Sequence, residues 1–365
     1  MYLRFFILLL ASLPAIFQPL MAQAPLRVAV VGLVHTHVHW ILGREKQSDI
    51  EIVAIVEPNR DLAERYAQQH GYDMNLVYAD LESMLNEVKP EAVTAFGTIL
   101  DHLTVVKACA PRGIHVMVEK PLAISHDHAR QMADLAEKHQ IHLLTNYETT
   151  WYGSHAEIFR LLNRDQTLGP LRKVVVHDGH PGPKEIGVNE EFLVWLTDPK
   201  YNGAGALTDF GCYGANLITW LAAGKRPLSV MALTQQLKPE IYPLVDDEAT
   251  ILLEYDGFQG IIQASWNWPV SRKDLEVYGQ KGQAFALNRS DVRVRLGDGA
   301  PEVSSAGAPL RPPYHDPFAY FAAVVRGQIQ PGPYDLSSLE NNLLVMEILD
   351  AARKSARTGK RIRIK

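Results

Sequence analysis

The stretch Ile114-His115-Val116-Met117-Val118-Glu119-Lys120-Pro121 decides the fold. Its apolar part, 114–118, has the length and composition of a buried strand. Lys120 therefore follows a strand's carboxyl end, where open α/β sheets bind their ligands. Pro121 keeps the chain out of a helix and restricts where the lysine points. Partial burial would lower the lysine pKa toward neutrality and make Lys120 a proton donor or acceptor, whereas an exposed lysine would merely end the strand.

Strands and helices alternate around this stretch, through residue 146. Apolar runs predict strands at 26–32, 50–56, 92–96, 114–118 and 141–144. Helical patterns lie at 38–45, 60–70, 103–110 and 125–139, the last of them capped by Ser125 or by His126-Asp127, and 78–85 has the pattern of a short strand end and a helix. This alternation predicts a doubly wound parallel sheet over residues 25–147.

The first two predicted strands carry the signals of a dinucleotide-binding Rossmann domain. The first ends in Gly32, and Glu57 follows the second, 25 positions later. A carboxylate at this spacing accepts the ribose hydroxyls of the cofactor. Because a carboxylate repels a 2′-phosphate, we expect NAD. Arg60 would offset part of that repulsion, so NADP stays open.

The loop after the first strand departs from the usual glycine pattern. It reads Gly32-Leu33-Val34-His35-Thr36-His37-Val38-His39-Trp40. Valine and histidine thus stand at the second and third glycine positions of GxGxxG, and a β-branched valine hinders close approach of the backbone to a pyrophosphate. We still expect this loop to bind the cofactor, through Gly32, Val34, His35, Thr36 and His37.

The same loop contains an HxHxH pattern. His35, His37 and His39 would share one side of an extended strand, and histidines in that arrangement can hold a metal. No set of carboxylate or cysteine partners accompanies them in the sequence, so we predict no metal. Metal analysis of the purified protein tests this alternative.

After residue 146 the pattern becomes that of a second α/β domain, 148–365. Short connections favour a mostly antiparallel sheet, with strands at 171–177, 228–233, 249–255, 260–266, 275–279, 284–287 and 292–296. Helices are predicted at 155–162, 191–196, 317–325 and 336–356, and a further apolar helix ends near Ala222. Residues 178–187 and 297–313 are rich in Gly and Pro and are typical of loops.

Asp209 and Tyr213 stand four positions apart at the start of a predicted helix, which would put them on one face. Together with Lys120 in one pocket they would form an acid–base set. The alternatives are a helix cap for Asp209 and a packed aromatic ring with a satisfied hydroxyl for Tyr213.

The composition and the N-terminal residues limit which partners and which cellular compartment we expect. A formal net charge of −5 gives no sign of nucleic-acid or anionic-membrane binding. Residues 1–24 combine a positively charged start, an apolar core too short for a membrane span and the site Ala22-Gln23-Ala24, which predicts a cleaved signal peptide. We expect an exported, periplasmic protein without a membrane anchor in its mature form. Whether its two cysteines, Cys109 and Cys212, are bonded stays open.

Several landmarks occur in a fixed order along the mature chain. Gly32, Glu57, Tyr78-x-Asp80, His102 and Glu119-Lys120-Pro121 are followed by Gly203-x-Gly205-x-Leu207-x-Asp209-x-Gly211-x-Tyr213-x-x-Asn216. In this order they resemble the Gfo/Idh/MocA oxidoreductase family. The resemblance implies a Rossmann domain with a bound nicotinamide, a second α/β domain whose open sheet serves homo-oligomerisation, and a sugar or polyol substrate.

By this resemblance Lys120 and Asp209 would be the catalytic pair. Many family members have a histidine where Tyr213 stands; tyrosine with Asn216 is similar to the glucose–fructose oxidoreductase branch, which is exported and keeps its cofactor tightly bound. The expected cofactor-binding set is completed by Glu57, Arg60, Thr98, His102, Glu119 and Lys120.

An exported dehydrogenase that released NADH at each turnover would stall, so we expect a cofactor that stays bound. One net reaction is oxidoreduction of a sugar. Another is NAD-dependent glycoside hydrolysis through a transient 3-keto intermediate, which needs further acid–base groups from the loop after residue 176: His177, His180, Lys184 and Glu185. A third possibility, from a different class, is a non-catalytic sugar- or metal-binding relative. Tyr147, Glu148, Trp151 and Tyr152 are candidates for the pocket wall.

Overall fold

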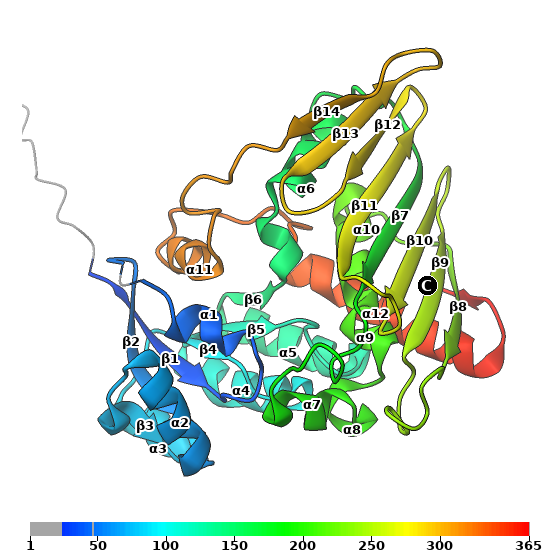
Figure 1. Cartoon of the computed structure of the whole chain (residues 1–365). Coiled ribbons are helices and arrows are strands. Elements are labelled where there is room, and N and C mark those ends of the chain that lie inside the picture. Colours follow the sequence, from blue (N-terminus) through cyan, green and yellow to red (C-terminus); the bar gives the residue numbers. More distant parts are fainter. Residues whose placement is uncertain (1–23, 46, 365) are drawn as a thin grey trace, which may run out of the picture.

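The computed structural model describes residues 24–45 and 47–364, so the predicted signal peptide lies almost wholly outside the described residues. Its first layer, sheet A, has six parallel strands in the order β3-β2-β1-β4-β5-β6 (Figure 1). The strands are β1 Leu26–Val31, β2 Ile50–Val56, β3 Val77–Tyr78, β4 Ala92–Ala95, β5 His115–Glu119 and β6 Leu143–Asn146. This is the order of the Rossmann fold, with its switch point between β1 and β4, and it confirms the predicted doubly wound sheet.

Helices cover sheet A on both faces because its central strands are apolar on both sides. They are α1 Val38–Leu42, α2 Arg60–His70, α3 Leu81–Glu87, α4 His102–Cys109 and α5 His126–His139. The Ser125 side chain caps α5 by accepting the N–H of His128 at 3.2 Å, as predicted. Helix α1 is shorter than predicted because Arg44 turns out of it to pair with Asp49 and Asp316.

The second layer, sheet B, has nine strands in the order β14-β13-β12-β11-β7-β10-β9-β8-β15. They are β7 Leu171–Gly179, β8 Ser229–Gln235, β9 Glu248–Glu254, β10 Gln259–Ser265, β11 Arg272–Gly279, β12 Gly282–Ala286, β13 Asp291–Leu296, β14 Val303–Ala306 and β15 Ile362–Arg363. Neighbouring strands are antiparallel except β7 and β10, which confirms the mostly antiparallel prediction. Strand β14 lies in a predicted loop; all of its side chains are exposed, so the sequence shows no alternation there.

The helices of the second half are α6 Gly153–Phe159, α7 Glu190–Leu196, α8 Pro199–Asn202, α9 Ala206–Asp209, α10 Gly211–Leu221, α11 Pro317–Val325 and α12 Leu339–Thr358. Helices α10 and α12 pack against sheet B, and α12 also contacts α5. Helix α11 instead returns to sheet A, where Phe318 and Phe321 share a core with Val28 and Val30 (Figure 1). No helix among the described residues combines the length and apolarity that a membrane span requires.

Candidate active site

Lys120 lies directly beyond β5, at the carboxyl edge of sheet A, and is 6% exposed. Its Nζ donates to a carboxylate oxygen of Asp209 and, at 3.1 Å, to the Asp209 carbonyl. The other carboxylate oxygen accepts the indole N–H of Trp266 at 3.0 Å. The predicted lysine–aspartate pair is therefore present, buried and held from both sides.

The pKa of Lys120 moves in the direction opposite to the expected one. Burial is the largest single effect and disfavours the ammonium, but the charge and hydrogen bond of Asp209, together with other nearby groups, outweigh it and raise the pKa of Lys120. Burial likewise opposes ionisation of Asp209, while Lys120 holds the pKa of that carboxyl below its usual value. The expectation of a lysine with a near-neutral pKa is wrong for this resting pair, in which Lys120 is protonated and Asp209 ionised.

Asp209 and Tyr213 do not share one helix, so the prediction from their spacing was wrong. Helix α9 ends at Asp209 and α10 begins after Phe210. The break has a local cause: Lys120 occupies the Asp209 carbonyl, and the Tyr213 N–H bonds to the Phe210 carbonyl at 3.1 Å instead. Tyr213 nevertheless reaches the pair, because its ring centroid lies 5.1 Å from Lys120 Nζ.

A cavity of about 720 Å³ opens over Lys120, between the edge of sheet A and sheet B. All four predicted catalytic residues line it: Lys120, His180, Asp209 and Tyr213. Thr36 and His37 of the phosphate loop also reach it. The remaining polar wall comes from groups that include Glu148, Tyr152, Arg272, Lys273, Asn288 and Arg289. The cavity thus joins the cofactor loop to a polar chamber.

A second lysine–carboxylate pair stands across the cavity. Lys273 on β11 binds the carboxylate of Glu148, which also accepts the Tyr152 hydroxyl at 2.7 Å. Burial opposes ionisation of Glu148, but Lys273 holds its pKa at about 2. The Tyr213 ring centroid lies 4.8 Å from Lys273 Nζ, so this ring contacts both ammonium groups. We predicted Glu148 as a wall residue and missed Lys273, because nothing in its local sequence separates it from a surface lysine.

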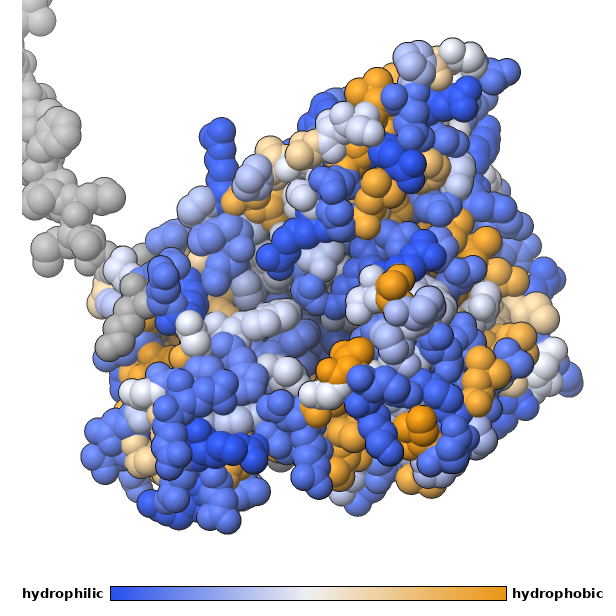
Figure 2. All heavy atoms as spheres, in the orientation of Figure 1, coloured by the Kyte–Doolittle hydropathy of each residue, from blue (hydrophilic) through white to orange (hydrophobic). Residues whose placement is uncertain are grey.

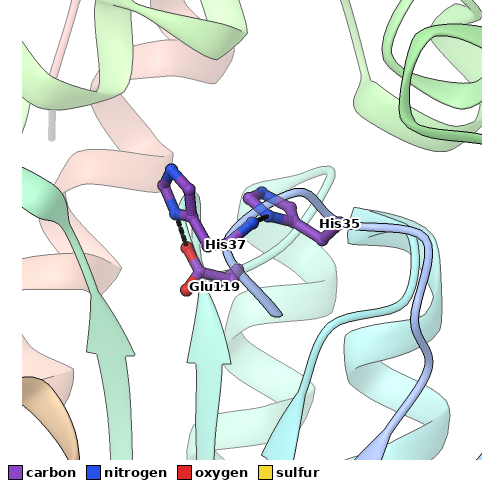
Figure 3. A group of neighbouring side chains, drawn as sticks. All are labelled: His35, His37 and Glu119. Atoms are coloured by element: carbon purple, nitrogen blue, oxygen red, sulfur yellow. Dashed lines mark hydrogen bonds and ion pairs between the residues drawn. The ribbon is translucent and has the colours of Figure 1, made fainter. Parts of the chain in front are cut away.

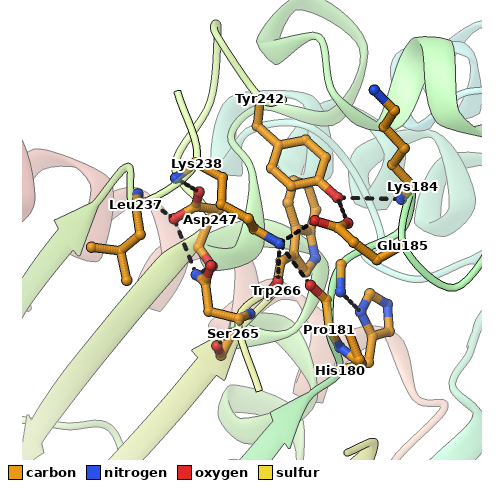
Figure 4. A network of polar contacts seen from close by, with 12 residues as sticks. His180, Pro181, Lys184, Glu185, Leu237, Lys238, Tyr242, Asp247, Ser265 and Trp266 are labelled. Atoms are coloured by element: carbon orange, nitrogen blue, oxygen red, sulfur yellow. Dashed lines mark hydrogen bonds and ion pairs between the residues drawn. The ribbon is translucent and has the colours of Figure 1, made fainter. Parts of the chain in front are cut away.

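Lys238 holds the loop after β7 in place through hydrogen bonds and an ion pair. Its Nζ donates to the carbonyls of Pro181 and Trp266, each at 2.7 Å, and to the carboxylate of Glu185 at 2.5 Å (Figure 4). Tyr242 donates its hydroxyl to the same carboxylate. Gly182 has φ +134, and a Cβ there would stand 2.1 Å from Glu185, so the loop requires glycine. Glu185 therefore holds the loop and does not face the cavity.

His180 is the residue of this loop that enters the cavity. Its Nδ1 accepts the N–H of Gly182 at 3.0 Å, so the neutral ring carries its proton on Nε2. Burial lowers the pKa of His180 and keeps the ring neutral. His177 lies beside Asp274, at 3.2 Å, and neither His177 nor Lys184 lines the cavity. One of the four additional acid–base candidates thus reaches the site.

The phosphate loop keeps one feature of its class. Gly32 has φ +81, and a Cβ at this position would lie 2.6 Å from the Gly97 nitrogen. The positive φ makes the tight turn that the first glycine provides in a dinucleotide-binding loop, and the close approach to Gly97 leaves no room for a side chain. Glu57 stands at the end of β2 as predicted, 4% exposed, but its two oxygens accept the N–H groups of Leu33 and Asn59 at 2.9 Å each.

Helix α7 lies against this loop. The rings of Phe192 and Trp195 pack on the imidazole of His35, at centroid distances of 4.9 and 5.7 Å. The Trp195 indole N–H donates to the Val34 carbonyl at 3.3 Å. Glu191 fastens the same helix to α2 through Arg65, at 2.7 Å. Helix α7 is therefore in direct contact with the loop at the position where a dinucleotide pyrophosphate would be expected.

The polar groups present fit NAD. Glu57 is an acceptor at the ribose-binding position, where each of its oxygens keeps a lone pair beyond the backbone N–H that it accepts. Thr36 and His37 stand between the loop and the cavity beside Lys120. These residues would hold the cofactor. Arg60 pairs with Glu64 on the surface of α2, at 2.8 Å, so it leaves the NAD preference of Glu57 intact.

Two of the predicted cofactor ligands are hydrogen-bonded within the fold. His102 is buried, and its Nδ1 hydrogen-bonds to the Leu122 carbonyl at 3.1 Å. Thr98 begins the turn before α4, and its hydroxyl donates to Asp101 at 2.7 Å. Neither lines the cavity over Lys120, and their contact with a cofactor stays a prediction.

Asp178 is a buried acid that sequence reasoning did not single out. It is 0% exposed on β7, paired in register with Lys273, and neither of its carboxylate oxygens has a hydrogen-bond partner within the described residues. Burial raises the pKa of Asp178 well above its usual value. A buried carboxyl without partners is most stable when it keeps its proton.

An Asp178→Asn variant is expected to gain stability relative to the parent as the pH rises. Below about pH 4 the carboxyl is protonated in both folded and unfolded chains. Above that pH the unfolded chain ionises while the folded chain keeps the proton, so the parent loses about 1.4 kcal/mol per pH unit until the folded pKa is reached. Urea unfolding of both proteins between about pH 4 and 7 measures this; a pH-independent difference would contradict the raised pKa.

A Rossmann sheet whose carboxyl edge presents a buried lysine–carboxylate pair to a second α/β domain defines a dinucleotide-dependent oxidoreductase. The family models agree. The model of the oxidoreductase family with the NAD-binding Rossmann fold, GFO_IDH_MocA, matches residues 26–147, and that of the GFO/IDH/MocA C-terminal domain matches residues 159–285. The chain belongs to the Gfo/Idh/MocA oxidoreductase family.

Three relatives illustrate this membership. Trans-1,2-dihydrobenzene-1,2-diol dehydrogenase of Xenopus laevis is 24% identical over 310 residues, which are 83% of this chain and 89% of the relative. D-glucoside 3-dehydrogenase of Escherichia coli is 32% identical over 122 residues, 32% of this chain and 33% of the relative. The structure of aldose-aldose oxidoreductase from Caulobacter crescentus has a TM-score of 0.78 at 20% identity, covering 93% of this chain and all of the other; it shares the fold.

Proposed function

We propose that the protein oxidises a hydroxyl group of a sugar or glycoside with a nicotinamide that stays bound between turnovers. One observation carries the proposal: a buried, protonated lysine paired with an aspartate faces a polar cavity of about 720 Å³ at the carboxyl edge of the Rossmann sheet. The names of the glucoside dehydrogenase and the aldose-aldose oxidoreductase support a sugar substrate.

NAD, when bound, supplies the acceptor for the hydride of the oxidised carbon. Lys120 and Asp209 handle the hydroxyl proton. Lys120 is protonated in the resting pair, so its Nζ has no lone pair until it passes a proton to Asp209 Oδ1. The neutral amine then accepts the hydroxyl proton of the substrate, so the pair acts as one base. In the reverse direction the same ammonium protonates the alkoxide.

The remaining groups of the cavity suit a sugar. The Nε2–H of His180 and the Tyr213 hydroxyl provide hydrogen-bonding groups. The rings of Tyr152 and Phe210 provide apolar faces for the C–H groups of a pyranose. The cavity that Lys120 lines can therefore bind several hydroxyl groups at once.

A second candidate is the redox-neutral glycosidase. The Lys273–Glu148 pair favours it, because a dehydrogenase needs one proton acceptor and this cavity contains two separate lysine–carboxylate pairs. After oxidation at C3, the C2 proton is acidic, and an ionised Glu148 is a carboxylate in the cavity that can accept it. His180 can donate a hydrogen bond from Nε2 to the leaving group.

The expected export is one reason to propose a cofactor that stays bound. The proposed assignment to the glucose–fructose oxidoreductase-like branch rests on the same expectation. Residues 1–24 carry the signal-peptide pattern, and a periplasmic enzyme has little free nicotinamide nucleotide to draw on. A mature protein that begins near residue 25 in the periplasmic fraction supports export; a full-length chain in the cytosol contradicts it.

Denaturing the purified protein is expected to release about one equivalent of NAD(H) per chain. Adding candidate aldoses and glycosides to the native protein should change the absorbance of the bound nicotinamide without releasing it. Cleavage of an aryl glycoside with no net NADH would select the glycosidase. A protein that releases no nucleotide and binds no added NAD or NADP would contradict both and support a non-catalytic sugar-binding relative.

The outer strands of sheet B offer a surface for the expected homo-oligomer. Met231, Leu233 and Leu252 are exposed there, on the adjacent strands β8 and β9. Figure 2 shows apolar side chains gathered over these strands on an otherwise mostly hydrophilic face. Such a patch is typical of a covered surface. Light scattering tests it, since the mass of a single chain would contradict the oligomer.

A further inference from the structure

Three potential metal ligands meet at the carboxyl edge of sheet A. His35 and His37 come from the phosphate loop and Glu119 from the end of β5, and one ligand atom from each lies within 4.8 Å of the others (Figure 3). His37 Nδ1 is 2.8 Å from Glu119 Oε2. This set differs from the HxHxH pattern of the sequence, because a carboxylate 82 positions after His37 replaces the third histidine.

His39 is excluded by the start of α1. Once the chain becomes helical at Val38, alternate residues no longer share a side. The His39 ring turns to α2, where its Nδ1 contacts His70 Nε2 at 2.8 Å. His39 is therefore a neighbour of the cluster in sequence only.

Each of the three side chains is fixed by contacts outside the cluster. The His37 ring stacks on Trp40 at a centroid distance of 3.8 Å. The His35 ring is enclosed by the α7 aromatics described above. Glu119 Oε1 accepts the side-chain N–H of Asn146 at 2.8 Å. In metalloproteins, contacts of this kind orient the side chains that bind the metal ion.

An ion would take over two existing contacts of the cluster. His35 Nδ1 accepts the His37 N–H at 3.1 Å, so an ion would replace this N–H at the Nδ1 lone pair. Glu119 Oε2 contacts His37 Nδ1 at 2.8 Å and would turn this contact toward the ion, while its Oε1 stays with Asn146.

We propose that His35, His37 and Glu119 bind one divalent transition-metal ion. Two imidazole nitrogens and one carboxylate oxygen suit Zn²⁺, Mn²⁺ or Fe²⁺ and disfavour Mg²⁺ and Ca²⁺, which prefer oxygen ligands alone. His37 lines the cavity, so the ion would keep a coordination position open toward substrate, as catalytic rather than structural metals do. An ion there would bind an oxygen of a sugar next to Lys120.

The test is a titration of the metal-stripped full chain with ZnCl2, MnCl2 or MgCl2, followed by calorimetry. We expect one equivalent of Zn²⁺ or Mn²⁺ and no saturable binding of Mg²⁺. His37→Ala and Glu119→Gln should each weaken binding at least ~10-fold. The matched control is His39→Ala, which removes a histidine of the same loop and should bind as the parent does.

Co²⁺ gives a second readout that does not depend on stability or activity. The parent and His39→Ala should show the visible absorption of a Co²⁺ ion with nitrogen ligands, and His37→Ala should lack it while its circular dichroism is unchanged. Parent affinity in both His37→Ala and Glu119→Gln, or no stoichiometric binding by the parent, overturns the site. Because His37 would also hold NAD, the titrations are made on chain from which the nucleotide has been removed. A nucleotide-free chain that rebinds NAD but binds no metal refutes only the metal site and leaves the proposed function intact.

Discussion

Replacing Lys120 by arginine is expected to lower kcat by about 10²–10⁴-fold and to leave the protein folded. Arginine keeps a positive charge against Asp209, so the buried carboxylate does not lose its partner. A guanidinium cannot release its proton at any accessible pH, however, and the proton relay from substrate to Asp209 is interrupted. The measurement is the rate at which the bound nicotinamide changes absorbance after a sugar is added.

Lys184→Arg is the matched control for this variant. It makes the same chemical change on an exposed lysine of the loop that carries His180, outside the cavity. Its kcat should equal that of the parent, whereas Lys120→Arg should retain bound NAD and the parental melting temperature. A Lys120→Arg enzyme that reduces its cofactor at the parental rate would remove Lys120 from the proton-transfer step.

The fold was largely predictable because its signals are local. Apolar strands such as Leu26–Val31, the Ser125 cap and the glycine after β1 each act within a few residues, and the structure contains all of them. Where the signal is absent, the prediction failed. Strand β14 is held by backbone pairing with β13 and buries no side chain.

The site was predictable only in part, because its members come from distant segments. Lys120 and Asp209 follow recognisable motifs, yet the pKa of Lys120 depends on a contact across 89 positions that no local pattern specifies. Lys273 and Asp178 are adjacent in sheet B and carry no motif at all. Conversely, Glu185 lies in a Gly- and Pro-rich loop and was a candidate acid–base group. Its carboxylate is bound by Lys238, and Glu185 does not line the cavity.

The position of α7 joins the two halves of the molecule. This helix belongs to the second half of the chain, yet its aromatic side chains lie on the phosphate loop of the first. The sequence alone could not predict this contact, because the Trp195 side chain and the Val34 carbonyl that it binds are 161 positions apart.

Asp209→Ala is expected to cost about 3–5 kcal/mol of stability at neutral pH, because it leaves the Lys120 ammonium buried without a counter-charge. Adding Lys120→Met to this variant removes the unpaired charge and should recover much of the loss. The free energy of unfolding from urea titrations of the parent, the two single variants and the double variant gives the coupling between the two side chains. Additive single-variant effects would contradict a coupled pair.

The stability lost in Asp209→Ala should depend on pH, because the substitution reverses the direction in which the pKa of Lys120 is shifted. In the parent the pKa of Lys120 is raised, so the pair contributes its full stability below the ordinary lysine pKa of about 10.4 and loses it as the pH climbs through the folded value. Without Asp209, burial is the dominant effect and lowers the pKa of Lys120, opposed only by weaker neighbours such as Glu119. The variant is then least stable below that lowered pKa and recovers as the pH rises toward about 10.4. The difference in the free energy of unfolding between the parent and Asp209→Ala should therefore decrease as the pH rises. A difference that increases would show that Asp209 is not what keeps Lys120 charged.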